Sequence, residues 1–417
     1  MSPQVLTWII AAIATAGVII RPFGLPEAIW AVAGAVLLVG LRLLSSADAL
    51  TGIGKGVDVY LFLAGMMLLA EIARDEGLFD WLAAAAAKHA DGSSSRLFLL
   101  VYVVGAIVTT FLSNDATAVV LTPAVAAAVS AAKAEDPLPY LLICAFIANA
   151  ASFVLPISNP ANLVIYGAHM PPLLQWLARY LAPSLVSILV TFLVLRWTQR
   201  EALRPRLSVD VPMPKLSRGG KLAALGIVAA SIVLLGASAL DIQLGLPTAI
   251  AGAVTAAVVV LLDPKNPWNT IKHISWSVLP LVAGLFVLVE ALDKTGLIAT
   301  IGSWLRGEVA RSQMQATWEA GVVIALASNL MNNLPAGLVA AGAVQNAQVP
   351  DGVRRAALIG VDLGPNLSVT GSLATILWLT ALRREGLTVG AWTFLKLGIL
   401  VMPPALLCAL GASLPFG

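Results

Sequence analysis

The chain has 417 residues, of which 59% are hydrophobic and only 11% charged, with a mean hydropathy of +0.91. Water-soluble domains carry about 45–50% apolar and about 25% charged residues, so this composition excludes an ordinary water-soluble fold. The 25 Lys and Arg and the 22 Asp and Glu are scattered between apolar runs, which argues against nucleic-acid binding. The sequence therefore predicts an all-α polytopic membrane protein.

A hydrocarbon core of about 30 Å requires roughly 20 apolar residues of helix. Uninterrupted spans of this kind are predicted at 4–20, 27–44, 57–73, 172–196, 221–240, 246–262, 276–292 and 390–414. Two further spans, 139–168 and 352–382, are interrupted by polar, Gly and Pro residues. A break survives in a bilayer only where protein or a water-filled cavity satisfies the freed backbone groups. The sequence thus predicts about ten transmembrane helices, two of them broken.

Two apolar segments are too short for two spans joined by a turn in water. Residues 96–132 are interrupted at Ser113-Asn114-Asp115, and residues 315–349 at Asn332-Asn333. We expect a re-entrant hairpin in each segment, with these polar residues at its tip. Stretches 78–92 and 297–311, which precede the hairpins, are expected to be amphipathic helices in the membrane surface.

The two halves of the chain resemble each other. Glu71 aligns with Glu290, and the segment 149–163 aligns with 362–376. Five spans per half is an odd number, so the second half enters the membrane from the opposite side. This is the pattern of secondary transporters, in which paired broken helices build the substrate site at the midplane. The predicted units are two inverted repeats at 1–196 and 221–417, joined by the linker 197–220.

Basic residues predict the orientation of the chain. The linker carries Arg200, Arg204, Arg206, Lys215 and Arg218, and the positive-inside rule places such a cluster in the cytoplasm. Both termini are then expected on the periplasmic side. No Lys or Arg precedes the first apolar run, so this run is interpreted as a span and not as a signal peptide.

Polar residues gather at the hairpin tips and in the broken spans. Amides and hydroxyls next to helix N-termini supply donors and acceptors without a fixed cation, which suits a small oxygen-rich solute. Small polar residues also bind packed helices together, but repeat-matched clusters at helix breaks favour a site. The predicted substrate-binding residues are Ser113, Asn114, Thr117, Ser158, Asn159, Asn162, Asn332, Asn333, Ser368, Thr370, Ser372 and Thr375.

Asp115 and Asp362 are the two acids predicted near mid-membrane, one from each half. Desolvation favours the neutral form of a carboxyl group, so such a residue can take up and release protons. We therefore predict a proton-coupling role for both. The alternative for each is a helix cap or a hydrogen bond that holds the hairpin shut. Glu71 and Glu290 end their spans beside other charges, and we expect an interfacial structural role for them.

The two cysteines, Cys144 and Cys408, lie far apart in apolar segments. They have neither metal-ligand nor C-x-x-C spacing, so we expect two buried small hydrophobic side chains. The sequence predicts no metal site and no cofactor. The proposed proton-coupling role of Asp115 and Asp362 predicts that the proton motive force is the energy source.

Several motifs resemble a known family. They are Leu112-Ser113-Asn114-Asp115, Leu121-Thr122-Pro123, Met331-Asn332-Asn333, Asp362-Leu363-Gly364-Pro365-Asn366 and Thr370-Gly371-Ser372-Leu373-Ala374-Thr375. Together, and over almost the whole chain, they look like those of the bacterial arsenite/antimonite efflux permeases, the arsenical pump membrane proteins of the ion transporter superfamily. The wider superfamily has Ser-Asn-Thr at both tips. The departure from it here argues against a sodium-coupled dicarboxylate carrier.

The resemblance implies a secondary transporter in the bacterial inner membrane. It would export trivalent arsenite and antimonite, as neutral trihydroxides, in exchange for protons, and some members work with a soluble cytoplasmic ATPase. Three alternatives stay open: a carrier of another small oxyanion or carboxylate, a sodium/proton antiporter on the same scaffold, and an intramembrane enzyme with Asp115 and Asp362 as an aspartyl pair. The enzyme requires the two carboxyl groups to lie within a few ångström of each other.

Overall fold

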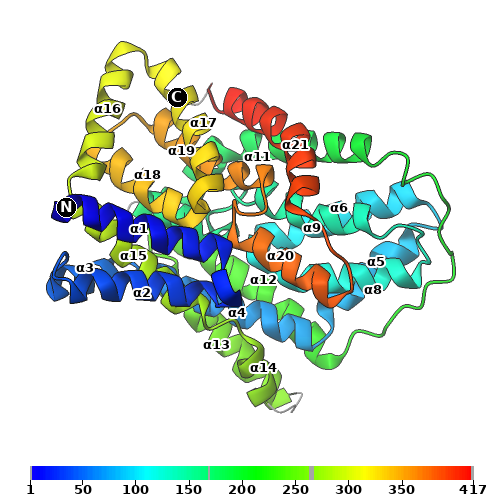
Figure 1. Ribbon diagram of the computed structural model, residues 1–417. Helices are drawn as coiled ribbons and strands as arrows, with labels where there is room; N and C mark the ends of the chain where they lie inside the picture. Colours follow the sequence, from blue (N-terminus) through cyan, green and yellow to red (C-terminus); the bar gives the residue numbers. More distant parts are fainter. Residues whose placement is uncertain (1, 168–169, 263–266, 415–417) are drawn as a thin grey trace.

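The structure is a computed structural model that describes residues 2–167, 170–262 and 267–414. In these residues the chain is helical and forms no β-strand (Figure 1), which confirms the predicted all-α membrane fold. The first half contains α1 (Pro3–Ile20), α2 (Glu27–Gly40), α3 (Ser46–Lys55), α4 (Val57–Asp75), α5 (Leu78–His89), α6 (Ser94–Phe111), α7 (Asn114–Ala116), the π-helical turn η2 (Thr117–Leu121), α8 (Thr122–Ala131), α9 (Leu138–Ala150), η3 (Pro156–Ser158), α10 (Pro160–Tyr166) and α11 (Leu173–Thr198). The second half contains α12 (Arg218–Ala239), α13 (Gly245–Leu262), α14 (Pro267–His273), α15 (Val278–Lys294), α16 (Leu297–Arg311), α17 (Gln313–Met331), α18 (Asn333–Ala347), α19 (Asp351–Leu363), η5 (Gly364–Leu367), α20 (Leu373–Arg384) and α21 (Ala391–Ser413).

The number of membrane-spanning helices is close to the prediction. Eight of the described helices are long and apolar enough to cross a membrane, or up to nine if the bent pair α3 and α4 counts as one span. Two of the eight, Ser94–Phe111 and Asn114–Ala131, are the arms of the first hairpin and were not among the ten predicted spans. Six of the predicted spans are among the eight, and a seventh, 57–73, lies in the bent pair. The others are missing because α2 has only 14 residues and because the broken spans are divided into short pieces. The sequence analysis did not predict α3, which meets α4 at a bend of 48°.

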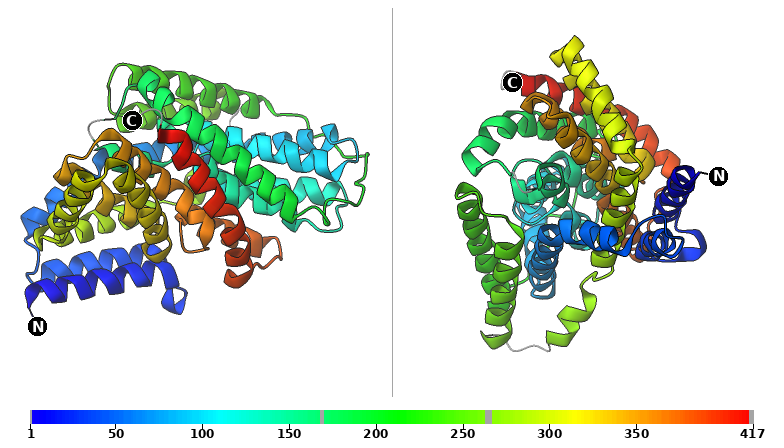
Figure 2. Two further views of the ribbon diagram at one scale, coloured as in Figure 1. Left: turned by 90° about the horizontal axis from the view of Figure 1, so that it is seen from above. Right: turned by 90° about the vertical axis from the view of Figure 1, so that its left-hand side faces the viewer.

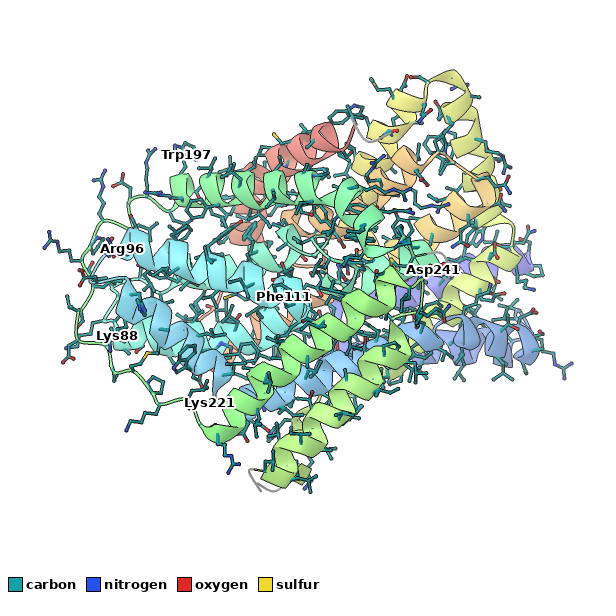
Figure 3. All side chains as sticks on the ribbon, turned by 180° about the vertical axis from the view of Figure 1, so that it is seen from behind. Lys88, Arg96, Phe111, Trp197, Lys221 and Asp241 are labelled. Carbon is teal, nitrogen blue, oxygen red and sulfur yellow. The ribbon has the colours of Figure 1, made fainter. Side chains whose placement is uncertain are left out.

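The linker between α11 and α12 closes one end of the molecule. The backbone N–H of Leu207 donates to the carbonyl of Gly92 (2.9 Å), and that of Ser208 donates to the carbonyl of Ala132 (2.8 Å). These two carbonyls mark the two ends of the segment that holds α6 and α8. In Figure 3, Phe111, the last residue of α6, lies at the centre of the molecule. The segment therefore enters and leaves at the linker end and turns in the interior, as a hairpin does.

The two ends of the molecule can be told apart in the figures. In Figure 3, Trp197 and Lys221, on either side of the linker, lie toward the end opposite to Asp241. In Figure 1, both marked termini lie toward the left and the linker runs along the right-hand edge. The termini and the linker are thus at opposite ends. Which end faces the cytoplasm stays a prediction.

The second hairpin segment, α17 and α18, lies at the end away from the linker. Figures 1 and 2 show these yellow helices far from the cyan helices α5, α6 and α8. The preceding helices follow the same division: α5 packs against α6 and α8, and α16 packs against α17 and α18. The two hairpin segments approach the centre from opposite ends, although the inverted-repeat relationship itself stays a prediction.

Close backbone contacts fix the second broken span against the second hairpin. A methyl group on Gly360 would collide with the carbonyl of Gly321 in α17, and one on Gly364 would collide with the carbonyl of Ala325. Small residues of this kind let helix backbones approach in a membrane, where packing replaces the hydrophobic driving force. The packing therefore positions the break after α19 directly beside α17.

Candidate functional site

The tip of the first hairpin is a short break between α6 and α7. Ser113 is the N-cap of α7, and its Oγ accepts a hydrogen bond from a backbone N–H three residues later (3.2 Å). The Oδ1 atom of Asn114 accepts from the N–H of Asp115 (2.9 Å), and the hydroxyl of Thr117 pairs with that of Thr109 (2.8 Å). The chain continues in η2, a π-helical turn of the kind often found at functional sites. The predicted tip residues thus lie together, and Ser113, Asn114 and Thr117 are buried.

The first broken span is held in shape by its own polar residues. The Nδ2 atom of Asn162 donates to three freed backbone carbonyls, those of Ser152, Leu155 and Pro156, at 2.9, 3.3 and 3.3 Å. The hydroxyl of Ser158 donates to the carbonyl of Thr110 near the end of α6 (2.9 Å). Asn162 therefore closes the break from within, and Ser158 ties it to the first hairpin.

The second broken span is held largely by the second hairpin. The Nδ2 atom of Asn329 in α17 donates to the carbonyl of Gly364 (2.9 Å). Its Oδ1 atom accepts from the hydroxyl of Ser368 (2.7 Å), and its carbonyl accepts from the hydroxyl of Thr370 (2.9 Å). Asn329 is thus the main polar link between α17 and the break, and it orients two of the predicted site residues.

The tip of the second hairpin is also attached to this break. The backbone N–H of Asn333 donates to the carbonyl of Gly371 (2.8 Å), and the side chain of Asn332 donates to the carbonyl of Thr370 (3.4 Å). Asn332 has φ 74° and ψ 152°, a backbone region occupied almost only by glycine, which costs about 1–3 kcal/mol. The surrounding contacts therefore hold this tip in a strained conformation.

Ser372 and Thr375 begin α20. The Oγ atom of Ser372 accepts from the backbone N–H of Thr375 (3.1 Å), and the two hydroxyls are 2.9 Å apart. Both side chains are buried. In this structure they form a helix N-cap, the structural role that competes with substrate binding for such residues.

The two broken spans cross each other, and the crossing is polar. The Nδ2 atom of Asn159, the N-cap of α10, donates to Oδ1 of Asp362 in α19 (2.6 Å). Asn149 in α9 donates to Oδ1 of Asn366 (3.0 Å), whose own Nδ2 donates to the carbonyl of Phe146 (3.0 Å). All four polar residues at the crossing have 0–2% exposed area. Residues about 200 positions apart in the sequence thus form one buried cluster.

Three acceptor atoms in the crossing and the adjoining first break lack a donor. They are Oδ1 of Asn149, Oδ1 of Asn162 and Oδ2 of Asp362, which have no hydrogen-bond partner among the described residues. Ser152 lies beside two of these side chains: its carbonyl accepts from Nδ2 of Asn162 (2.9 Å), and its hydroxyl, which donates to the backbone carbonyl of Asn149 (2.8 Å), lies beside Asp362. Unpaired buried acceptors are costly. The arrangement therefore suits a ligand that brings O–H donors or a cation.

Asp115 lies in different surroundings from Asp362. It lines a small cavity of about 60 Å³, together with Glu71 and Met66 of α4, Ser113 and Pro160. Pro160 follows Asn159 directly, so the cavity lies beside the polar crossing. No hydrogen bond joins Asp115 to Asp362 in the described part of the chain. The structure thus brings Asn159 and Asp362 into contact, whereas the two predicted coupling acids are separate groups.

A much larger cavity, of about 1520 Å³, opens between α4, α12, α13, α15 and α18. Its polar lining includes Lys55, Asp58 and Glu290, and Lys55 Nζ lies 2.5 Å from Glu290 Oε2. Asp58 accepts a hydrogen bond from Gly245 at the start of α13 (2.7 Å), so this cavity lies toward the end away from the linker. Glu290 and Glu71 both form ion pairs, and each faces a cavity.

Sequence reasoning missed four polar residues of the crossing and the two breaks: Asn149, Ser152, Asn329 and Asn366. Two of them carried a usable signal, because Asn149 aligns with Asp362 in the internal repeat and Asn366 ends the Asp-Leu-Gly-Pro-Asn motif. Asn329 has no such signal. Its role depends on the close approach of α17 to η5, which a single sequence does not reveal.

The two cysteines differ in environment. Cys144 in α9 is buried as predicted, but Cys408 in α21 is exposed. The prediction for Cys408 was wrong because an apolar helix does not reveal which of its faces packs inside and which faces outward. Within the described residues, no three His, Cys, Asp or Glu side chains gather in a way that could hold a metal ion.

Comparison with known proteins places the chain among transporters. The family model described as citrate transporter (CitMHS) matches residues 8–361. The arsenical pump membrane protein of Escherichia coli is 26% identical over 407 residues, which cover 95% of each chain. The protein of the same name from Yersinia enterocolitica is 26% identical over 360 residues, which cover 83% of each chain.

One solved structure supports the fold independently. The YdaH transporter of Alcanivorax borkumensis is similar with a TM-score of 0.62, over 100% of this chain and 99% of that chain. At 16% sequence identity, this similarity concerns the fold alone.

Proposed function

Since the chain belongs to the citrate transporter (CitMHS) family and is a membrane transporter, we propose that it exports trivalent arsenite and antimonite in exchange for protons. The substrates would cross as neutral trihydroxides. The relatives named arsenical pump membrane proteins support this substrate class. The alternatives from the same class are another small oxyanion or carboxylate, and a sodium ion exchanged for protons.

The unpaired acceptors at the crossing carry this proposal. A neutral trihydroxide brings three O–H donors, and Asn149, Asn162 and Asp362 each offer an oxygen without a donor. Citrate would instead bring several negative charges next to the Asp362 carboxyl group. The nearest basic residue along α19 is Arg355, seven positions earlier and therefore about 10 Å away along the helix. The donor and charge pattern favours the neutral solute.

Asp362 also provides a way to couple the substrate to a proton. Its Oδ1 accepts from Asn159 (2.6 Å), while Oδ2 has no donor in the described structure. A proton and a substrate hydroxyl would therefore compete for the same oxygen, so that one leaves as the other arrives. Asp115, at the tip of the first hairpin, would exchange its proton with the adjacent cavity.

The proposed orientation follows from the charges of the linker. With the basic linker in the cytoplasm, the protein would lie in the bacterial inner membrane with both termini in the periplasm. A soluble ATPase, where one is used, would dock at the linker end. An enzymatic role for an Asp115–Asp362 pair is not proposed, because the two groups make no hydrogen bond to each other in the described residues.

The test is arsenite uptake into everted membrane vesicles from an arsenite-sensitive bacterial strain. We expect uptake that follows an imposed pH gradient and stops with a protonophore, and we expect Asp362→Asn to abolish it. Cys408→Ser is the control, because its exposed thiol lies outside the crossing. Uptake no greater than that of vesicles without the protein would refute arsenite transport. Pronounced uptake of citrate or sodium in its place would support the corresponding alternative.

A further inference from the structure

Glu71 lies near the linker end of α4 and is almost completely buried. Its exposed fraction is 6%. Glu76, five residues later, accepts a hydrogen bond from the hydroxyl of Ser217 in the linker (3.1 Å). At about 1.5 Å per residue, Glu71 is therefore about 7 Å from the point where α4 meets the linker. The carboxyl group lies inside the protein but close to the linker surface.

Glu71 and Asp115 line the same cavity. Its volume of about 60 Å³ is enough for a few water molecules. Its lining also includes two serines, Ser113 and Ser275, the latter in the loop before α15. Two acids and two serines among the lining residues can supply the several polar partners that buried water requires. The cavity thus offers a path for protons between the hairpin tip and the linker end.

Three other titratable or charged groups act on Glu71. Arg74 on the same helix forms an ion pair with it, and Asp75 shares that arginine at 3.1 Å. His273 in α14 is the third. Arg74 is one third exposed, so the pair links the buried carboxyl group to the water at the linker end. Burial disfavours the carboxylate form of Glu71, and the guanidinium of Arg74 offsets part of this cost.

We propose that Glu71 carries protons between Asp115 and the linker side of the molecule. In the export direction, protonated Asp115 gives its proton to a cavity water while this water gives a proton to the Glu71 carboxylate. Glu71 then releases the proton to water beside Arg74. Only O–H bonds form and break, and no electrons are transferred. The inference rests on the proposed function, because it requires Asp115 to exchange protons during transport.

The aligned residue Glu290 shows that burial alone does not create this role. Glu290 has the same exposed fraction, 6%, and is paired with Lys55. It faces the larger cavity, whereas Asp115 lines the smaller one. The shared cavity with Asp115, and not the acidic residue as such, distinguishes Glu71.

The experiment uses the full-length protein in liposomes that contain a pH-sensitive dye. Two rates are measured: proton flux driven by an arsenite gradient, and arsenite exchange at equal pH. We expect Glu71→Gln to lower the proton flux by about tenfold or more, while exchange stays close to wild type. Glu71→Asp keeps the carboxyl group, so we expect it to restore much of the flux with a shifted pH profile. The matched control is Asp75→Asn. This variant removes the other carboxylate that pairs with Arg74, and Asp75 does not line the cavity.

Three results would overturn the relay. The first is an unchanged proton flux and pH profile in Glu71→Gln. The second is an equal loss of flux and exchange, reproduced by Arg74→Gln, because it would mean that only the ion pair matters. The third is Glu71→Asp being as defective as Glu71→Gln. A wild-type protein that moves no protons with arsenite would instead refute the proposed function, so the two failures can be distinguished.

Discussion

The two broken spans solve the same problem in different ways. In the first, Asn162 and neighbouring side chains of the same half satisfy the freed carbonyls: Asn162 serves three of them, Trp176 donates to Phe153 and Val154, and Ser187 donates to Ala150 (2.9 Å). In the second, the donors and acceptors come mostly from the second hairpin, through Asn329, Asn332 and Asn333. The freed carbonyls of the first break are therefore served by Asn162 from within the break and by α11, whereas the second break depends on the second hairpin.

The difference between the two breaks affects Asp362, the proposed proton-coupling residue. Asp362 lies in the helix that leads into the second break, and its partner Asn159 lies in the first. A shift of the second hairpin would change the second break and leave the first intact. We therefore expect the Asn159–Asp362 contact to respond to the position of the second hairpin.

The largest expected effect tests the first break. Asn162→Ala leaves three buried carbonyls without their side-chain donor. Each unsatisfied buried group costs roughly 1–3 kcal/mol, so we expect a loss of about 3 kcal/mol or more in stability. The measurement is thermal unfolding of the purified protein in detergent. A near wild-type midpoint would mean that the first break does not depend on Asn162.

An intermediate effect is expected in the second break. Asn329→Ala removes a donor to Gly364 and an acceptor for Ser368, two bonds at about 1 kcal/mol each. We expect a destabilisation of about 2 kcal/mol, smaller than for Asn162→Ala, together with slower arsenite transport because the hairpin no longer holds the break. Ser45→Ala, at an exposed cap of α3, serves as the control for transport. If Asn329→Ala leaves transport at the wild-type rate, the proposed dependence of the second break on the hairpin is wrong.

The fold was largely predictable because a bilayer imposes strong rules on sequence. Low charge, span lengths and the polar interruptions at 139–168 and 352–382 were enough to predict an all-α protein with breaks where the structure has them. Helix ends were less predictable: α2 stops at Gly40, and Arg42 adopts a left-handed conformation that apolar composition does not reveal.

The segments that form the candidate site could be predicted from the sequence, but the contacts between their residues could not. Polar residues in apolar segments identify the tips and breaks, and Asp362 was singled out by its depth in a span. The pairing of Asp362 with Asn159 required two helices from different halves to cross. The cavity shared by Glu71 and Asp115 required the packing of α4 against the first hairpin. Such long-range geometry is fixed by packing, which one sequence does not specify.

The smallest expected effect compares the two hairpin tips. Asn332 has φ 74° and ψ 152°, whereas Ser113 at the first tip is in ordinary extended backbone with φ −177°. Asn332→Gly relieves strain of about 1–3 kcal/mol but gives up two long hydrogen bonds of 3.4 Å and adds about 0.5–1 kcal/mol of glycine entropy. We therefore expect a stability equal to wild type or higher by about 1 kcal/mol. Ser113→Gly has no strain to relieve and should destabilise the protein by about 0.5–1 kcal/mol. Thermal unfolding of both variants measures this difference in stability. An equal loss of stability in both would show that the second tip stores no strain. The two hairpins would then differ only in their hydrogen bonds to the breaks.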